Sequence, residues 1–265
     1  MTGLPPRTPT LSPEGRGRRA LDAALFDVGG TLWPNSWPFR ESDGEGRRGR
    51  IRRAMPSLDA KTVDALVDDL IESSRFGDLA RTVSTETEMP VDADTLITGC
   101  LVRQGLEAGA DSVTRIRRAM ALPITDRLKP LPGARELLAE ARNLGLRTVI
   151  ASNTYWRDAE SYWDDFRGLE LAQHIDAIVT SVDAGHLKPH PAVFELAIKA
   201  AGVPAERCVV IGNREENDVL PAIALGMRTI LVHPDDPTPE SSCADAVAPD
   251  LWAAAQALRD MLQKS

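Results

Sequence analysis

Residues 23–32, Ala-Ala-Leu-Phe-Asp-Val-Gly-Gly-Thr-Leu, form a short apolar run that ends in an acid and a Gly-Gly turn. Apolar runs of this kind are typical of strands that are buried in a parallel sheet. A carboxylate at the carboxyl end of such a strand lies at the edge where open α/β sheets bind ligands. Gly29 and Gly30 let the backbone approach whatever Asp27 contacts. The segment predicts a strand over about 22–27 and a candidate functional carboxylate, although a strand-end Asp that only caps the next turn gives the same pattern.

Strands and helices alternate along the second half of the chain. Apolar runs predict strands at about 146–151, 175–181, 207–211 and 228–232, with a last fragment near Ala246. Helices are predicted at about 133–143, 158–172, 191–201, 219–225 and 250–262. Strands that alternate with helices indicate an α/β fold with a doubly wound parallel sheet.

A helical insertion separates the first strand from the others. Residues 33–56 are charged and predict irregular structure, whereas helices are predicted at about 58–76, 92–108 and 111–121. An apolar stripe marks the first of these helices, whose start Ser57 or Asp59 could cap. No strand-like run interrupts the insertion. We therefore predict a flexible tail at 1–20, a core domain at 21–39 and 127–265, and an all-helical domain at 40–126.

The composition disfavours several classes of protein. A chain of 265 residues, of which 43% are hydrophobic, can build a large core. Its net charge of −8 argues against a general affinity for nucleic acid or an anionic membrane. No apolar run approaches the roughly 18 residues of a membrane span, and the N-terminus has no apolar signal-peptide core. The cysteines are widely spaced, so we expect no disulfide framework or zinc cluster and a reducing, cytoplasmic location: Cys100, Cys208 and Cys243.

Polar residues follow four of the predicted strands. Asp27 ends the first, Ser152-Asn153 the second and the segment 212–218 the fourth, and Lys188 lies a few residues beyond the third. A parallel sheet brings all four ends to one edge. Such a set suits phosphoryl-type chemistry: a carboxylate attacks, a hydroxyl and an amide hold the oxyanion, a lysine neutralises charge and further oxygens hold a metal.

These four segments resemble the four motifs of the haloacid dehalogenase-like (HAD) hydrolase superfamily. The first motif, Asp-x-Asp-x-Thr/Val, is matched by Asp27-Val28-Gly29-Gly30-Thr31, and the second, a Ser or Thr at a strand end, by Ser152. The third, a Lys commonly before Pro, is matched by Lys188-Pro189, and the fourth, Gly-Asp-x-x-x-x-Asp, by Gly212-Asn213 and Asp218. The resemblance covers the chain after the tail. It implies a Rossmann-like core and a small helical cap, of the C1 type, inserted after the first strand.

The resemblance also implies a role for each matched residue. Asp27 would be the nucleophile that forms an aspartyl intermediate, within a motif that Thr31 completes. Ser152 and the Asn153 backbone would bind the transferring group, and Lys188 would pair with Asp27 and with that group. Mg²⁺ would be held by Asp27, the Gly29 carbonyl, Asn213 and Asp218. The implied partner is a small anionic substrate, and the oligomeric state stays open.

Two positions depart from the superfamily pattern. Gly29 stands where phosphatases of the superfamily carry the Asp that acts as general acid–base, and losing a positioned acid typically costs about 10²–10⁴ in rate. Some phosphatase-like members also carry Gly at this position. Asn213 stands where a metal-binding Asp is usual. Its amide offers an oxygen without a charge, so we expect weakened Mg²⁺ binding.

Four functions therefore stay open. Hydrolysis of a phosphate ester, which we favour, needs a good leaving group or an acid from the cap. C–halogen hydrolysis needs no metal and suits Asn213, but that branch carries an aromatic residue where Gly29 stands. Phosphonate cleavage needs a cap lysine that forms a Schiff base, and Lys61 is the only lysine in 40–126. A binding or scaffold protein that kept the fold and lost the chemistry would explain both departures.

Three further groups of residues have both a structural and a functional interpretation. Aromatic residues after the first two motifs either pack the insertion against the core, which we favour, or line a pocket: Trp33, Trp37, Phe39, Tyr155, Trp156, Tyr162, Trp163 and Phe166. A basic cluster either forms a solvated face or grips an anionic substrate: Arg47, Arg48, Arg50, Arg52 and Arg53. His186 and His190 flank Lys188, but the adjacent prolines disfavour a helix-borne metal site.

Overall fold

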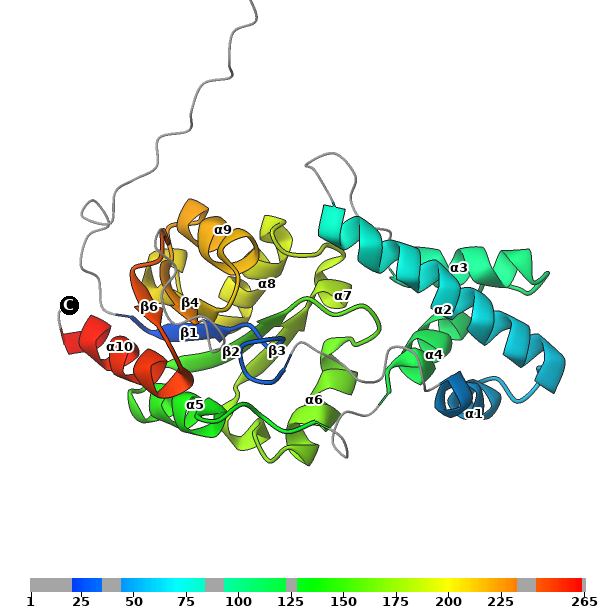
Figure 1. Ribbon diagram of the computed structural model, residues 1–265, viewed down its shortest axis with the longest axis horizontal. Coiled ribbons are helices and arrows are strands. Elements are labelled where there is room, and N and C mark those ends of the chain that lie inside the picture. Colours follow the sequence, from blue (N-terminus) through cyan, green and yellow to red (C-terminus); the bar gives the residue numbers. More distant parts are fainter. Residues whose placement is uncertain (1–20, 35–43, 84–92, 123–127, 233–241, 264–265) are drawn as a thin grey trace, which may run out of the picture.

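The computed structural model describes residues 21–34, 44–83, 93–122, 128–232 and 242–263, and within these ranges six strands form one sheet (Figure 1). The strand order is β3-β2-β1-β4-β5-β6, and every neighbouring pair is parallel. The strands span Ala23–Phe26 (β1), Arg147–Ser152 (β2), Ala177–Thr180 (β3), Cys208–Gly212 (β4), Arg228–Val232 (β5) and Ala246–Ala248 (β6). The predicted α/β fold with a parallel, doubly wound sheet is confirmed.

Strand β1 lies in the middle of the sheet, where Phe26 is aligned with Ile150 of β2 and with Ile211 of β4. Helices cover both faces of the sheet (Figure 1): α5 (Ala134–Asn143), α6 (Ala159–Gly168) and α10 (Leu251–Gln263) on one, α8 (Pro191–Ala201) and α9 (Leu220–Ala224) on the other. All four residues of β1 are buried for this reason. Burial on both faces explains why this strand is apolar throughout rather than alternating.

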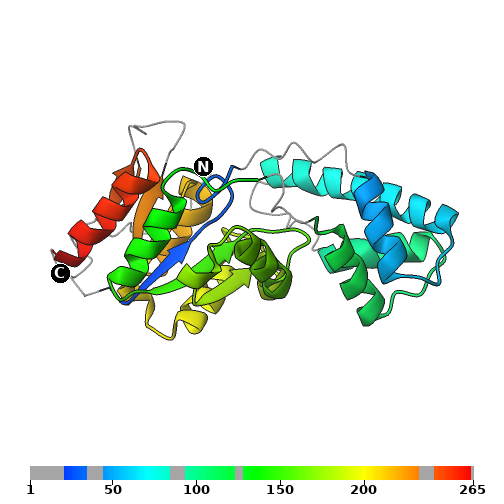
Figure 2. The ribbon, with the colours of Figure 1, turned by 90° about the horizontal axis from the view of Figure 1, so that it is seen from below.

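Between β1 and β2 the chain forms a bundle of helices: α1 (Gly44–Ala54), α2 (Ala60–Val83), α3 (Ala93–Arg103) and α4 (Ala110–Met120). The bundle encloses a hydrophobic cluster of its own, which includes the predicted apolar stripe of α2. Asp59 caps α2, because its Oδ1 accepts the Thr62 N–H at 3.0 Å. Figures 1 and 2 show the bundle at one end of the molecule, beyond the loop that follows β1. The boundaries predicted at 39/40 and 126/127 fall outside the described residues, so the division into two domains stays a prediction.

The prediction of irregular structure at 33–56 is wrong for its second part, because α1 is helical. Only Ile51 of this helix is buried, so the segment has no apolar period to detect. Ion pairs hold α1 against α2 instead: Arg48 lies 2.5 Å from Asp68, and Arg52 lies 3.0 Å from Asp64. A helix that is held in place by charge carries little of the signal on which periodicity depends.

Several predicted boundaries shift by a few residues. The predicted helix at 92–108 ends at Arg103, and a π-helical turn, Glu215–Val219, precedes α9. The predicted strand at 175–181 ends at Thr180, whose hydroxyl caps the short helix α7 (Ser181–Ala184). The tail predicted at 1–20 lies outside the described residues. No helix in the described ranges combines the length and the apolar character that a membrane crossing needs.

Candidate active site

The carboxyl ends of three adjacent strands meet at one edge of the sheet. Asp27 directly follows β1, and its backbone N–H donates to the Ile211 carbonyl of β4 at 2.9 Å. Ser152 is the last residue of β2 and Gly212 the last of β4. This edge is where ligands bind in sheets of this strand order.

Lys188 joins two of the predicted site residues. Its Nζ lies 2.6 Å from Asp27 Oδ1 and 2.6 Å from Asp218 Oδ1. The side chains of Lys188, Asp27 and Asp218 are only 2%, 10% and 2% exposed. Three residues that are far apart in the sequence thus form one buried, charged triad, as the predicted convergence of strand ends requires. Their roles in a reaction stay predictions.

The triad has one more negative than positive charge. Burial alone would lower the pKa of Lys188, but Asp218 and Asp27 outweigh this and raise the pKa above its ordinary value. Burial, aided by the charge of Asp27, raises the pKa of Asp218 to about 6, because one ammonium only partly offsets two carboxylates. The triad therefore holds a net negative charge in a place that water hardly reaches.

Asp218 reaches the triad because Gly212 has no side chain. The π-helical turn brings Asp218 back over the end of β4, where its Oδ2 accepts the Arg214 N–H at 3.1 Å. A Cβ on Gly212 would lie 2.5 Å from Asp218 Cγ, which no side chain tolerates. The glycine of the fourth motif is thus needed to admit the aspartate of the same motif.

Thr31 and Asn213 lie on the other side of Asp27. The Thr31 hydroxyl donates to Asp27 Oδ2 at 3.0 Å and lies 3.4 Å from Asn213 Oδ1. Gly30 has a φ of +84°, and a Cβ there would clash with the Asn213 amide. The Gly-Gly turn is therefore required both by its backbone conformation and by the close approach of Asn213.

The second motif contacts one residue that the sequence did not single out as part of the site. The Ser152 hydroxyl lies 3.5 Å from the hydroxyl of Tyr162, whose pKa is raised by burial. Next to it, Asn153 bonds to the backbone of Lys188 through both ends of its amide. Tyr162 stood out only as one of several aromatic residues, since its partner depends on how α6 packs.

The described aromatic residues pack in two groups. Trp33 is buried against Tyr162 and Phe166, with ring centroids 5.7 and 4.9 Å apart. Tyr155 and Trp156 form a T-shaped pair at 4.7 Å and pack against the hydrophobic cluster of the bundle. The contact of Tyr155 and Trp156 with the bundle agrees with the favoured interpretation, whereas Trp33, Tyr162 and Phe166 pack within the core cluster and not between the insertion and the core. Trp37 and Phe39 lie outside the described residues.

The basic cluster and the histidine pair have structural partners. Arg50 donates to the Ala119 and Arg118 carbonyls at 2.9 Å and so satisfies the end of α4. The rings of His186 and His190 stack with centroids 3.9 Å apart, so their in-plane lone pairs do not converge on one ion. Nowhere among the described residues do three or more His, Cys, Asp or Glu side chains form a group that could hold a metal.

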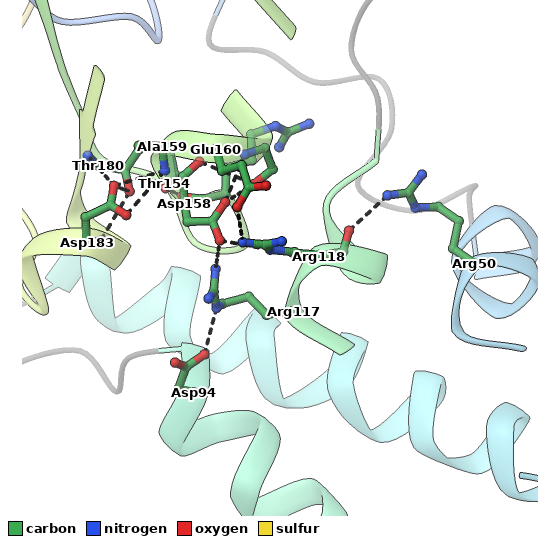
Figure 3. Close-up of polar contacts among 12 residues, drawn as sticks. Arg50, Asp94, Arg117, Arg118, Thr154, Asp158, Ala159, Glu160, Thr180 and Asp183 are labelled. Carbon is green, nitrogen blue, oxygen red and sulfur yellow. Dashed lines mark hydrogen bonds and ion pairs between the residues drawn. The ribbon is translucent and has the colours of Figure 1, made fainter. Parts of the chain in front are cut away.

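An ion-pair cluster ties the bundle to the segment after Ser152 (Figure 3). Asp158 Oδ2 lies 3.1 Å from both Arg117 and Arg118 of α4, and Arg118 also pairs with Glu160 at 2.5 Å. Asp158 caps α6 as well, accepting the Ser161 N–H at 2.9 Å. Burial opposes its charge, but the bonds from Ser161 and Arg117 prevail and lower the pKa of Asp158 to about 2. No sequence pattern indicated these contacts beyond the predicted start of a helix at 158.

The oxygens of the triad and of the neighbouring Asn213 are chemically suited to Mg²⁺. Asp27, Asp218 and Asn213 offer carboxylate and amide oxygens, which are the hard ligands that this ion prefers. The net negative charge of the triad also favours binding of Mg²⁺, because a dication would offset that charge. The residues present therefore fit the ion, with one uncharged ligand among them.

The chain belongs to the haloacid dehalogenase-like hydrolase family, whose profile matches residues 21–226. The predicted family and the predicted class of enzyme, a hydrolase, are thereby confirmed.

Curated relatives match parts of the chain. Haloacid dehalogenase-like hydrolase domain-containing protein 3 of Xenopus laevis is 38% identical over 107 residues, which are 40% of this chain and 42% of that protein. The glyceraldehyde 3-phosphate phosphatase of Methanopyrus kandleri is 26% identical over 217 residues, 80% of this chain and 84% of that one. The phosphoserine phosphatase of Thermus thermophilus is 30% identical over 141 residues, 51% and 55% of the two chains. The chain thus spans less than half of the Xenopus protein.

Solved structures share the fold. The HAD phosphatase from Thermococcus onnurineus superposes with a TM-score of 0.56 at 17% identity, over 90% of this chain and 98% of that one. The 2-haloacid dehalogenase from Pseudomonas syringae gives a TM-score of 0.55 at 21% identity, over 92% and 99%. At such identities the likeness establishes the architecture alone.

Proposed function

We propose that the protein hydrolyses a small organic phosphate ester through a covalent intermediate on Asp27. The observation that carries the proposal is the buried triad, in which Lys188 holds the Asp27 carboxylate at the carboxyl end of the central strand. The names of the phosphatase relatives support a small phosphate ester as the substrate class.

The proposed reaction has two steps. An Asp27 oxygen attacks phosphorus, the bond from phosphorus to the ester oxygen breaks, and that oxygen leaves as an alkoxide, which takes a proton from solvent. The Ser152 hydroxyl, the Asn153 backbone and Lys188 neutralise the phosphoryl oxygens. Water then attacks the phosphorus of the acyl phosphate, which releases inorganic phosphate and restores the Asp27 carboxylate.

Gly29 limits the substrates that react well. Because it has no side chain, it cannot donate a proton to the departing alcohol. The proposal therefore favours esters of acidic alcohols, whose oxygen leaves without help, or a proton donor on the helical bundle.

Mg²⁺ belongs to the proposal as a bound cofactor. Asp27, the Gly29 carbonyl, Asn213 and Asp218 would hold it, and it would supply positive charge opposite the phosphoryl group. Asn213 makes this site weaker than one with a third carboxylate. We also propose that 40–126 acts as a cap domain and that the protein works in the cytoplasm, where its three free cysteines would stay reduced.

A second candidate is hydrolysis of a carbon–halogen bond. It is favoured by the observation that Lys188 pairs with both carboxylates, so that the protein itself supplies a counter-ion for the Asp27 charge. A halide leaving group needs no proton, which suits Gly29.

A substrate panel with and without Mg²⁺ tests these proposals. The wild-type chain is expected to release phosphate faster from aryl phosphates than from sugar phosphates, and Asp27→Asn should lower the rate by about 10³-fold or more. Asp164→Asn, which alters an exposed aspartate of α6, serves as the control. Halide release from a 2-haloacid without Mg²⁺ would favour the second candidate. A folded wild-type chain that turns over neither class would overturn both and favour the scaffold interpretation.

A further inference from the structure

Asn153 is bonded to the main chain of Lys188. Its Nδ2 donates to the Lys188 carbonyl at 3.0 Å, and its Oδ1 accepts the Lys188 N–H at 2.7 Å. One planar amide thus satisfies both backbone groups of a single residue. Lys188 lies between α7 and α8, outside any helix or strand, so no regular ladder fixes its backbone.

The position of the Lys188 backbone matters because the ammonium group at the end of the Lys188 side chain is tightly held. Nζ lies 2.6 Å from a carboxylate oxygen of Asp27 and equally far from one of Asp218. The side chain is 2% exposed, so no water shell can replace a lost contact. A displacement of about 1 Å at a site of this kind can cost about 10²-fold in rate.

We propose that Asn153 is a positioning residue, whose side chain fixes the Lys188 backbone and so aims the ammonium between Asp27 and Asp218. This role differs from that of the Asn153 backbone, which is proposed to bind the transferring group. It also links two motifs, because the residue that follows Ser152 sets the geometry of the lysine. The catalytic consequence rests on the proposed function, whereas the structural consequence does not.

Lysine NMR tests the structural consequence without any substrate. The chain has five lysines, and Lys61, Lys129 and Lys199 are exposed, so ¹⁵N-lysine labelling of the full chain gives few signals. In the wild-type protein the Nζ protons of Lys188, assigned by their loss in Lys188→Met, should exchange slowly. In Asn153→Ala they should exchange about tenfold faster, the change expected from loss of hydrogen bonding at the backbone.

Asn143→Ala is the matched control, since Asn143 lies exposed at the end of α5. It should leave the Lys188 signal unchanged. An Asn153→Ala protein that folds with a wild-type Lys188 signal and exchange rate would overturn the proposal. If Asn153→Ala does not fold, Asn153→Ser gives the same comparison with a polar side chain in place of the methyl group.

Kinetics test the catalytic consequence. With a reactive aryl phosphate, Asn153→Ala is expected to lower kcat by about 10–100-fold and to change KM little. In a Lys188→Met background the same substitution should cost nothing further, because Asn153 acts through the lysine. Additive losses would overturn the proposal. If the wild-type chain hydrolyses no phosphate ester, the proposed function fails, and the NMR comparison still decides the role of Asn153.

Discussion

Two glycines in the motifs make room for polar side chains of the site. Gly212 lies under the Asp218 carboxylate, and Gly30 lies under the Asn213 amide. In both cases a single methyl group would occupy the space that the polar group needs. The arrangement around Asp27 therefore depends on side chains that are absent as much as on those that are present.

Gly212→Ala is expected to displace Asp218 from Lys188. The new Cβ would lie 2.5 Å from Asp218 Cγ, so the variant should lose about 1–3 kcal/mol of unfolding free energy and most of its activity. Urea unfolding and phosphate release measure the two effects. Gly49→Ala in α1 is the control, because its Cβ would meet only the tip of Arg53 at 3.8 Å. Wild-type activity in Gly212→Ala would show that activity does not depend on the observed position of Asp218.

Asn213→Asp is expected to tighten Mg²⁺ binding. An added carboxylate supplies the charge that the proposed metal site lacks, and the Mg²⁺ concentration for half-maximal activity should fall by about tenfold. A Mg²⁺ titration after treatment with a chelator measures the change. Asn217→Asp adds the same charge four residues further along the chain, in the π-helical turn, and should leave the titration unchanged. If the two variants behave alike, residue 213 does not bind the ion.

At the scale of the elements, α4 and α6 are joined by charge. Arg117 and Asp158 have side chains only 8% and 10% exposed, so their pair is shielded from solvent, whereas Arg118 lies at the surface. The segment 153–158, which precedes α6, therefore contacts the triad through Asn153 and the bundle through Asp158 (Figure 3).

Asp158→Asn is expected to loosen this contact without removing the helix cap. Asparagine caps helices about as well as aspartate, so the variant isolates the loss of charge opposite two arginines. We expect a loss of about 1–3 kcal/mol in the free energy of unfolding, measured by urea denaturation. Asp164→Asn in the same helix breaks only an exposed pair with Arg167 and should cost less than about 1 kcal/mol. Equal losses would mean that the contact contributes no more than a surface pair.

The same residue predicts how stability depends on pH. The pKa of Asp158 is lowered to about 2 in the folded protein, against about 3.9 in an unfolded chain. The folded state therefore binds this proton less readily, and the resulting stability is present above about pH 4 and lost as the pH falls toward 2. The difference in unfolding free energy between the wild-type protein and Asp158→Asn should shrink over that window. A difference that stays constant from pH 7 to pH 3 would contradict the low pKa.

At the scale of the whole molecule, the sequence predicted the sheet and the meeting of its strand ends. Asp27, Ser152, Lys188 and Asp218 could be placed together because the strands of a parallel sheet all end at the same edge. The contacts of Tyr162, Asp158 and the Asn153 side chain could not, since they depend on helix packing and side-chain conformation. Helix α1 was missed because it has a single buried residue and is held by ion pairs.

The central place of β1 bears on how the protein is made. This strand is synthesised before both of its neighbours, because β2 and β4 begin only at residues 147 and 208. The backbone N–H and C=O groups along its edges stay unpaired until those strands are translated, and unpaired edges promote aggregation. The helical bundle, whose contacts are local, can form during this interval. A nascent chain that stalls before residue 208 therefore exposes one unpaired edge of its central strand, to which a chaperone could bind.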